Sequence, residues 1–442
     1  MAELFDLIVK GGTVVNHDGE AVRDIGIVGG RIAAIGDISA TRAAEVIDAK
    51  GLHVLPGVID SQVHFREPGL EHKEDLATGS LAAVSGGVTV VFEMPNTKPL
   101  TTTEETLADK VARARGRMHC DFAFYVGGTR ENVGNIPHLE RLEASAGIKV
   151  FMGASTGDLL IEDEATLEKV IAAISRRAAF HAEDEARLRE RAKLRVPGDP
   201  SSHPVWRDEV AAMIATERLV RLAEKYRKRV HVLHVSTAEE MEFLRDHKAW
   251  ASVEVTPHHL TLMAPDCYER LGTYAQMNPP VRDARHLQAL WAAVADGTVD
   301  VLGSDHAPHT REEKDHPYPE SHSGMTGVQT LVPVMLDHVN AGRLSLQRFV
   351  DLTSHGPARL FGISGKGRIA VGYDADLTVV DLKRTMTITN DWIKSRCGWT
   401  PYHGGSVRGW PVGTFVRGNA VMWDGEILTP GVGEPAQFHE GG

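Results

Sequence analysis

Three histidines lie at or near the ends of short apolar runs that are far apart in the sequence. His64 is in VLPGVIDSQVHF, His181 follows AAF, and His234 follows VHVL. Imidazole is a common zinc ligand, and a catalytic zinc site keeps one position open for water. Each histidine alone has an ordinary interpretation as a hydrogen-bonded polar residue. If the three runs are neighbouring strands of one sheet, their shared position instead predicts a metal site.

A lysine and an aspartate occupy similar positions in two further apolar runs. Lys149 lies in GIKVFMGAS, where a charged amine is costly to bury unless an acid pairs with it or the side chain reaches solvent. A neutral amine can take up carbon dioxide, and the resulting carbamate has two oxygens that can bridge metals. Asp305, in GSDHAPH, can bind metal and move a proton, or it can cap the following helix.

The middle of the chain alternates such apolar runs with amphipathic helical stretches, which is typical of a parallel sheet wrapped by helices. Eight runs predict a closed (β/α)₈ TIM-like barrel, whose catalytic groups lie at the carboxyl ends of the strands. The runs are VLPGVIDSQVHF, VTVVFEMPN, CDFAFYVGG, GIKVFMGA, AAFHAED, VHVLHVST, ASVEVTPHHL and VDVLGSDHAPH.

Both ends of the chain have a different sequence pattern, with short strand-like runs broken by glycine. This pattern covers residues 4–55 and returns after about residue 366. We therefore expect an α/β protein in which residues 56–365 form the barrel, while 1–55 and 366–442 combine into a small β-sandwich with a tail.

Composition narrows the class of protein. The formal net charge is −12 over 442 residues, which offers no basic surface for nucleic acid. The three cysteines have no CxxC spacing, as expected in a reducing compartment. The first residues resemble neither a signal peptide nor a membrane anchor. We expect a cytoplasmic protein that binds a small molecule and has no nucleic-acid or membrane partner.

Two longer motifs resemble those of dihydroorotases, members of the cyclic amidohydrolase superfamily that also includes hydantoinases and allantoinases. They are DSQVHFREPG at 60–69 and GSDHAPHTREEK at 303–314. The shorter motifs MPNTKP, KVFMGAS, HAED, HVLHVST, VEVTPHHL and MNPPVR occur between them in the order expected for the family. The resemblance spans nearly the whole chain.

The resemblance implies a set of site residues. The metal ligands would be His64, carbamylated Lys149, His181, His234 and Asp305, holding one or two Zn²⁺ bridged by Lys149. Arg66 and Asn96 match positions that hold the substrate carboxylate, although a structural salt bridge is the ordinary interpretation of a lone arginine. Asn278, His309 and the backbone at Ser323 and Gly324 match positions that touch the ring or ureido group.

The implied activity is that of a dihydroorotase, the reversible hydrolysis and cyclisation between dihydroorotate and N-carbamoyl-L-aspartate in pyrimidine biosynthesis. A metal-bound hydroxide would attack the ring amide, with Asp305 as general acid/base. An arginine such as Arg66 suits a carboxylated substrate. The resemblance also implies a homo-oligomer, a dimer or a tetramer.

Three alternatives stay open. A hydantoinase or dihydropyrimidinase would act on another ring, but such enzymes tend to have tyrosine five residues after the bridging lysine, where this chain has Ala154. An allantoinase has overlapping features. A protein of another class would keep the fold for a structural or regulatory role without catalysis.

Gln62 departs from the family pattern. The usual His-x-His of the first strand is replaced by Gln62, Val63 and His64. An amide oxygen is a poorer zinc ligand than imidazole. The consequence would be a weakened first metal, a single metal centred on His181 and His234, or a loss of catalysis.

Overall fold

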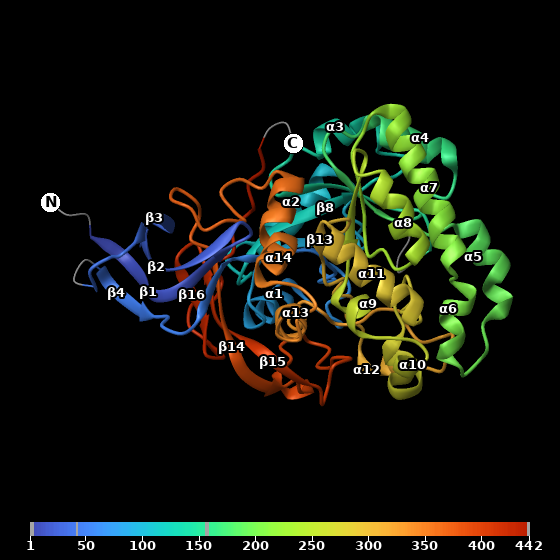
Figure 1. Ribbon diagram of the computed structural model, residues 1–442. Coiled ribbons are helices and arrows are strands. Elements are labelled where there is room, and N and C mark those ends of the chain that lie inside the picture. Colours follow the sequence, from blue (N-terminus) through green and yellow to red (C-terminus); the bar gives the residue numbers. More distant parts are fainter. Residues whose placement is uncertain (1–3, 41–42, 155–158, 440–442) are drawn as a thin grey trace.

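Eight parallel strands form a barrel in the computed structural model, which describes residues 4–40, 43–154 and 159–439 (Figure 1). Consecutive strands are neighbours throughout the sheet. The first and last strands meet through a parallel bridge between Val63 and His306, where the His64 amide donates to the His306 carbonyl (2.7 Å). The barrel strands are β6 (Val58–Val63), β7 (Val88–Glu93), β8 (Asp121–Gly127), β9 (Ser145–Phe151), β10 (Ala178–His181), β11 (Val230–Val232), β12 (Ala251–Val255) and β13 (Val301–Leu302).

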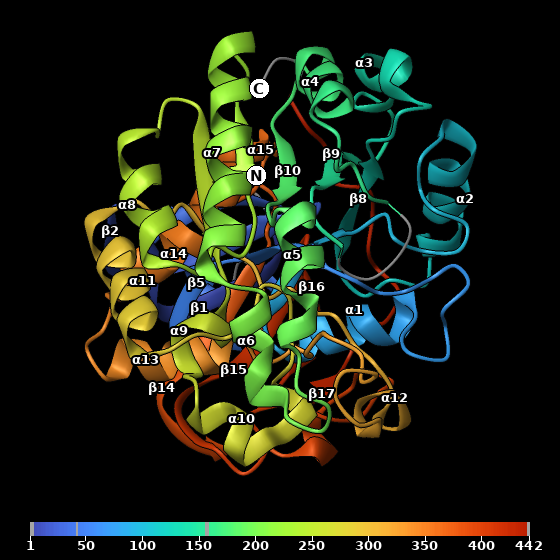
Figure 2. The same cartoon turned by 90° about the vertical axis from the view of Figure 1, so that its right-hand side faces the viewer.

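Helices cover the outside of the barrel, as Figure 2 shows for α4, α5, α7 and α8. Their first turns are fixed by side-chain caps, such as Asp208 before α7 and Thr103 before α2. The helices are α1 (Leu76–Ser85), α2 (Glu104–Ala114), α3 (Ile136–Leu139), α4 (Glu164–Ala173), α5 (Glu185–Arg191), α6 (His203–Trp206), α7 (Glu209–Tyr226), α8 (Ala238–Asp246), α9 (Pro257–Thr261), α10 (Asp266–Leu271), α11 (Ala284–Asp296), α12 (Arg311–Asp315), α13 (Leu331–Asn340), α14 (Leu346–Val350) and α15 (Gly356–Phe361). Among the described residues, none of these is long and apolar enough to cross a membrane.

Both chain ends contribute to one mixed sheet of nine strands, in which the blue and red strands of Figure 1 lie together. The N-terminal strand β1 pairs in parallel with β4 and β5, and β5 pairs antiparallel with β14 of the C-terminal segment. The strands are β1 (Phe5–Asn16), β2 (Gly19–Val28), β3 (Arg31–Gly36), β4 (Ala43–Asp48), β5 (His53–Pro56), β14 (Leu377–Thr387), β15 (Ser406–Val416), β16 (Asn419–Trp423) and β17 (Glu426–Ile427).

The predicted fold class is confirmed: the eight apolar runs supply the eight barrel strands, and the two ends share a second sheet. One boundary differs. The run VLPGVIDSQVHF contains two strands, because its first residues form β5 in the mixed sheet and only Val58–Val63 enters the barrel. Gly57 separates them at a close approach, where a Cβ would lie 2.2 Å from the Thr89 hydroxyl.

A buried cluster of charges joins the barrel to the C-terminal segment. The Lys366 amine, 6% exposed, lies 2.8 Å from Asp121 at the start of β8 and also pairs with Asp374 and Asp376. Arg417, which directly follows β15 of the mixed sheet, also contacts Asp121. Removing one member of a buried ion-pair network leaves the others without compensation, which is costly.

We predict that Lys366→Met lowers the free energy of unfolding by about 3–5 kcal/mol, because Asp376 stays buried without a side-chain cation and Asp121 keeps only Arg417. Urea unfolding measures the change. Lys225→Met is the matched control, since it removes an exposed pair with Glu168 and should cost about 1 kcal/mol or less. Equal effects of the two substitutions would contradict the role given to Lys366.

Candidate metal centre and active site

A narrow cavity lies at the carboxyl ends of the barrel strands. It is lined by Gln62, His64, Lys149, Phe151, His181, His234, Asn278, Asp305, Ala307, Ser323 and Gly324. Its volume is about 10 Å³, which is room for about one water-sized group. The lining side chains therefore fill most of the space at the mouth of the barrel.

Most of the residues that the sequence singled out therefore lie together. All five predicted metal ligands line the cavity, with Asn278, Ser323 and Gly324. The other three lie beside it: Asn96 Oδ1 is 2.8 Å from His64 Nδ1, and Arg66 Nη2 is 3.3 Å from His309 Nε2. Segments from almost the whole length of the barrel meet at this one place.

Three of these residues have a left-handed backbone. The φ angles are 67° at Arg66, 39° at His234 and 48° at Asp305. This conformation costs a non-glycine residue about 1–3 kcal/mol and is found most often where function fixes the position of a side chain. Each of the three follows a barrel strand, so the turn aims the side chain across the barrel mouth.

His181 and His234 face each other across the cavity. Nδ1 of His181 is 3.1 Å from Nε2 of His234, and Nε2 of His181 donates to Glu183 (2.8 Å). Glu183 is also held by Arg207, whose Nη2 lies 2.6 Å away. Burial would raise the pKa of Glu183, but Arg207 and His181 outweigh it and hold the pKa below its usual value. The carboxylate therefore fixes the His181 tautomer with Nδ1 as the free acceptor.

His64 and Asp305 form the second facing pair, with His64 Nε2 3.3 Å from Asp305 Oδ1. Burial lowers the pKa of His64 to about 4, so the ring is neutral near pH 7. Gln62 Nε2 donates to the same Asp305 oxygen at 3.0 Å. The side-chain oxygen Oε1 of Gln62 is buried with no hydrogen-bond partner among the described residues. The family's missing histidine is thus replaced by a side chain that is bound to Asp305.

Lys149 completes the lining from β9. Its side chain is 1% exposed, and its Nζ lies 4.4 Å from the Phe151 ring centre. Burial lowers the pKa of the amine to about 7. A substantial share of the amine is therefore neutral near pH 7, and a neutral amine is the form that reacts with carbon dioxide.

These donors suit a divalent cation. Ligand nitrogens about 2.0–2.1 Å from a tetrahedral zinc lie a little over 3 Å apart, close to the His181–His234 separation. Hydrogen bonding to Glu183 is the usual support for a ligating imidazole. Within the described ranges, no group of three or more His, Cys, Asp or Glu side chains is arranged to hold a metal. A lysine amine is not among these ligand types, so Lys149 does not count toward such a group.

Two buried cations lie on one side of the cavity. Arg66 is 2% exposed, and Lys73, 7% exposed, lies 3.2 Å from His309 Nδ1. Burial lowers the pKa of Arg66 to about 10, which still leaves it charged at pH 7. Glu313 contacts Lys73 at 2.9 Å. Asp305, Glu93 and Glu313 lie near Arg66, but none of them forms an ion pair with it among the described residues, so the guanidinium can still bind an anionic group.

The loop that carries Ser323 and Gly324 is held by Lys314. Its buried Nζ donates to the carbonyls of His322 (2.7 Å), Gly324 (3.1 Å) and Gln276 (3.3 Å). Gly324 has φ 146°, and a Cβ there would lie 2.5 Å from the Ala307 carbonyl oxygen. Only glycine fits this backbone.

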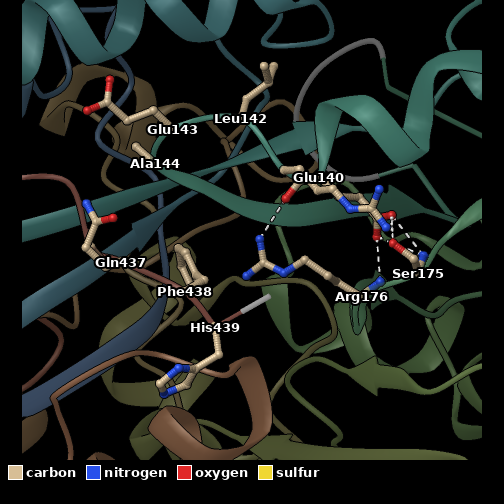
Figure 3. Close-up of a pocket in the computed structure, with 11 residues that line it drawn as sticks. Glu140, Leu142, Glu143, Ala144, Ser175, Arg176, Gln437, Phe438 and His439 are labelled. Carbon is tan, nitrogen blue, oxygen red and sulfur yellow. Dashed lines mark hydrogen bonds between the residues drawn. The ribbon is translucent and has the colours of Figure 1, made fainter. Parts of the chain in front are cut away.

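A larger cavity lies at the opposite end of the barrel and does not offer comparable chemistry (Figure 3). Its volume is about 410 Å³, and it is next to the start of β9 and β10. Glu140 accepts from the Ser175 and Arg176 amides, while Arg176 Nη1 donates to the carbonyls of Glu140 and Ser145. These groups satisfy one another, as expected for the stabilising end of a barrel.

Comparison with known proteins agrees with this geometry. The sequence profile described as "Amidohydrolase family" matches residues 53–421, most of the chain. The chain belongs to the amidohydrolase family. This amidohydrolase is 38% identical to a protein named dihydroorotase from Methanosarcina acetivorans, covering 97% of the chain and 95% of the relative. It is 34% identical to one of the same name from Bacillus subtilis, covering 95% and 99%.

Among solved structures, the amidohydrolase fold is shared with an L-hydantoinase (dihydropyrimidinase) from Arthrobacter aurescens. The TM-score is 0.93 at 33% identity, over 98% of this chain and all of that one. A D-hydantoinase structure has a TM-score of 0.88 at 27% identity, over 97% of this chain and 98% of that chain. The architecture is therefore common to enzymes named for different rings.

Several residues of this site were missed by sequence reasoning. Glu183 lies in the HAED motif two residues after His181, and this spacing was a usable signal. Lys73 and Arg207 gave none, because each acts from a loop whose position depends on the folded barrel, while Lys314 ends the motif at 303–314 without any indication of its role.

We predict that Glu183→Gln weakens zinc binding by about 10–100-fold, because the amide removes the carboxylate that orients His181. Competition with a chromophoric chelator measures the affinity. Glu140→Gln makes the same substitution at a buried site on the far side of the barrel and should leave zinc affinity unchanged. Equal affinity of the Glu183 variant and the unmodified protein would refute this support of His181.

Proposed function

We propose that this amidohydrolase is a dihydroorotase, which interconverts dihydroorotate and N-carbamoyl-L-aspartate. One observation carries the choice of substrate: the buried cations Arg66 and Lys73 lie beside a cavity of metal-type donors. Dihydroorotate joins a cyclic amide to a carboxylate and needs both features. The full-length likeness to proteins named dihydroorotase supports the same choice.

We further propose that His64, carbamylated Lys149, His181, His234 and Asp305 hold one or two zinc ions. The cation would lower the pKa of a water molecule and polarise the amide carbonyl. The chain prepares these groups by keeping the imidazoles neutral. Burial is the main cause of the lowered pKa at His64, His181 and His234.

Asp305 is the proposed general acid/base. Its Oδ1 accepts from Gln62, while Oδ2 receives no hydrogen bond from the described residues. In hydrolysis Asp305 takes the proton of the attacking water and gives it to the leaving ring nitrogen. In the reverse direction Asp305 removes a proton from the ureido nitrogen, which attacks the carboxyl carbon, and returns this proton to the carboxyl oxygen that leaves as water when its C–O bond breaks.

The substrate carboxylate would be held by Arg66 and Asn96. Asn278 and the backbone at Ser323 and Gly324 would contact the ring. His309 acts through its neighbours: its Nε2 donates to the Ser323 carbonyl (3.0 Å), and its Nδ1 contacts Lys73. It therefore joins the carboxylate side of the site to the ring side.

A hydantoinase is the second candidate, favoured by the structural likeness to hydantoinases. The neutral rings hydantoin and dihydrouracil give Arg66 and Lys73 no anionic partner. Assays of the purified protein with dihydroorotate, hydantoin, dihydrouracil and allantoin separate these functions. We expect turnover with dihydroorotate; turnover only with the neutral rings would overturn the proposal.

We predict that Asp305→Asn lowers kcat by about 10²–10⁴-fold, because the amide cannot carry the proton. Metal content should stay close to that of the unmodified protein, since an amide oxygen and the other ligands remain. Steady-state kinetics and metal analysis on the same sample test both statements. Retained turnover would exclude Asp305 as the proton carrier.

We also predict that Lys149 takes up ¹³C-labelled bicarbonate as a carbamate, since burial keeps part of the amine neutral. Carbon NMR of the intact protein should show one carbamate signal that is absent from Lys149→Arg. Lys225→Arg, at an exposed lysine, should keep the signal. Absence of the carbamate signal from the unmodified protein in the presence of bicarbonate and zinc would count against Lys149 as the bridging ligand.

A further inference from the structure

The side chain of His203 contacts Asn278 behind the cavity. His203 begins the short helix α6 and is 1% exposed. Its Nε2 is 2.9 Å from Asn278 Oδ1 and 3.0 Å from the Met277 carbonyl oxygen, and its Nδ1 is 3.3 Å from Trp206 Nε1. Asn278 itself lines the cavity.

The partners of His203 determine which ring nitrogen carries the proton. The indole of Trp206 can only donate, so His203 Nδ1 has to accept. The Met277 carbonyl can only accept, so Nε2 has to donate. Both contacts require the same neutral tautomer, and burial, which lowers the pKa of His203 to about 3, keeps the ring neutral.

This tautomer fixes the amide of Asn278. Because His203 Nε2 donates, the atom of Asn278 that faces it has to be the oxygen, and the other end of the amide is the NH₂ group. No described residue accepts a hydrogen bond from Nδ2. A cyclic ureide presents C=O and N–H groups in alternation, so the amide orientation decides which of them it can meet.

We infer that His203 is a specificity-determining positioning residue, which holds Asn278 as a hydrogen-bond donor for a ring carbonyl oxygen. The inference deepens the proposed function and rests on it, since dihydroorotate has a urea carbonyl between two N–H groups. A substrate with an N–H group in place of this carbonyl would set its own donor against the NH₂ donor of Asn278 and be rejected.

The surroundings of α6 keep the arrangement in place. The Trp206 ring lies 5.0 Å from the Arg207 guanidinium and 5.2 Å from that of Arg195. Arg207 in turn holds Glu183, the partner of His181. One short segment therefore orients both an imidazole of the proposed metal centre and the amide that faces the ring.

Two nearly isosteric variants separate donor from acceptor at position 203. His203→Gln can place an N–H near Nε2 and keep the Asn278 amide in its present orientation. His203→Glu places an acceptor there, which favours the reversed amide. Glu also introduces a charge. Thermal unfolding is therefore measured beside the kinetics, as the folding control for both variants and for Trp206→Phe.

The test compares dihydroorotate with its analogue in which sulfur replaces the urea oxygen, a weaker acceptor. We expect the unmodified protein and His203→Gln to prefer the oxygen compound in kcat/KM. In His203→Glu this preference should fall by about tenfold, mainly through KM. An unchanged preference in the folded Glu variant would overturn the inference.

Nitrogen NMR of ¹⁵N-histidine protein gives a readout that needs no substrate. The His203 signals, identified by their loss in His203→Gln, should show a protonated Nε2 and an unprotonated Nδ1; the opposite tautomer refutes the inference. If the protein acts on another cyclic ureide and not on dihydroorotate, the proposed function fails. The same oxygen–sulfur comparison on that ring then decides the role of His203.

Discussion

Closure of the parallel barrel is the constraint on which the site depends. The hydrogen bond from the His64 amide to the His306 carbonyl joins the end of the first strand to the residues after the last. Gln62 and Asp305, 243 positions apart in the chain, thereby come within 3.0 Å. Because all eight strands run in the same direction, their carboxyl ends form one rim, and side chains at or after several of these ends meet in one small space.

Of the side chains that hold the rim residues, Glu183, Arg207, His203 and Lys314 lie outside the cavity, whereas Gln62 lines it. Glu183 and Arg207 fix His181, Gln62 binds Asp305, His203 binds Asn278, and Lys314 gathers the loop of Ser323 and Gly324. Positions with a strained backbone, such as Asp305, persist only where such contacts determine them. The outer contacts therefore supply the rigidity that a site for a small ring requires.

Gln62 shows how a departure from the family pattern is accommodated. In place of a histidine ligand, the chain has an amide whose N–H end is bound to the proposed proton carrier. The hydrogen bond holds Asp305 in place and leaves a buried carbonyl oxygen next to the metal-type donors. Gln62 thus contacts Asp305, while His181 and His234 lie 3.1 Å apart between Nδ1 and Nε2.

The sequence by itself determined the barrel, the second sheet shared by the two chain ends, and the identity of the residues at the strand ends. Strand and helix periodicity can be recognised within a short stretch of sequence. Within its own apolar run, one polar residue stands out in each case: His64, Lys149, His181, His234 and Asp305. Only the tertiary structure decided which side chains orient them. The contacts of Arg207 with Glu183 and of His203 with Asn278 join segments that are 24 and 75 positions apart, and a hydrogen bond of about 3 Å depends on how the barrel closes rather than on any local pattern.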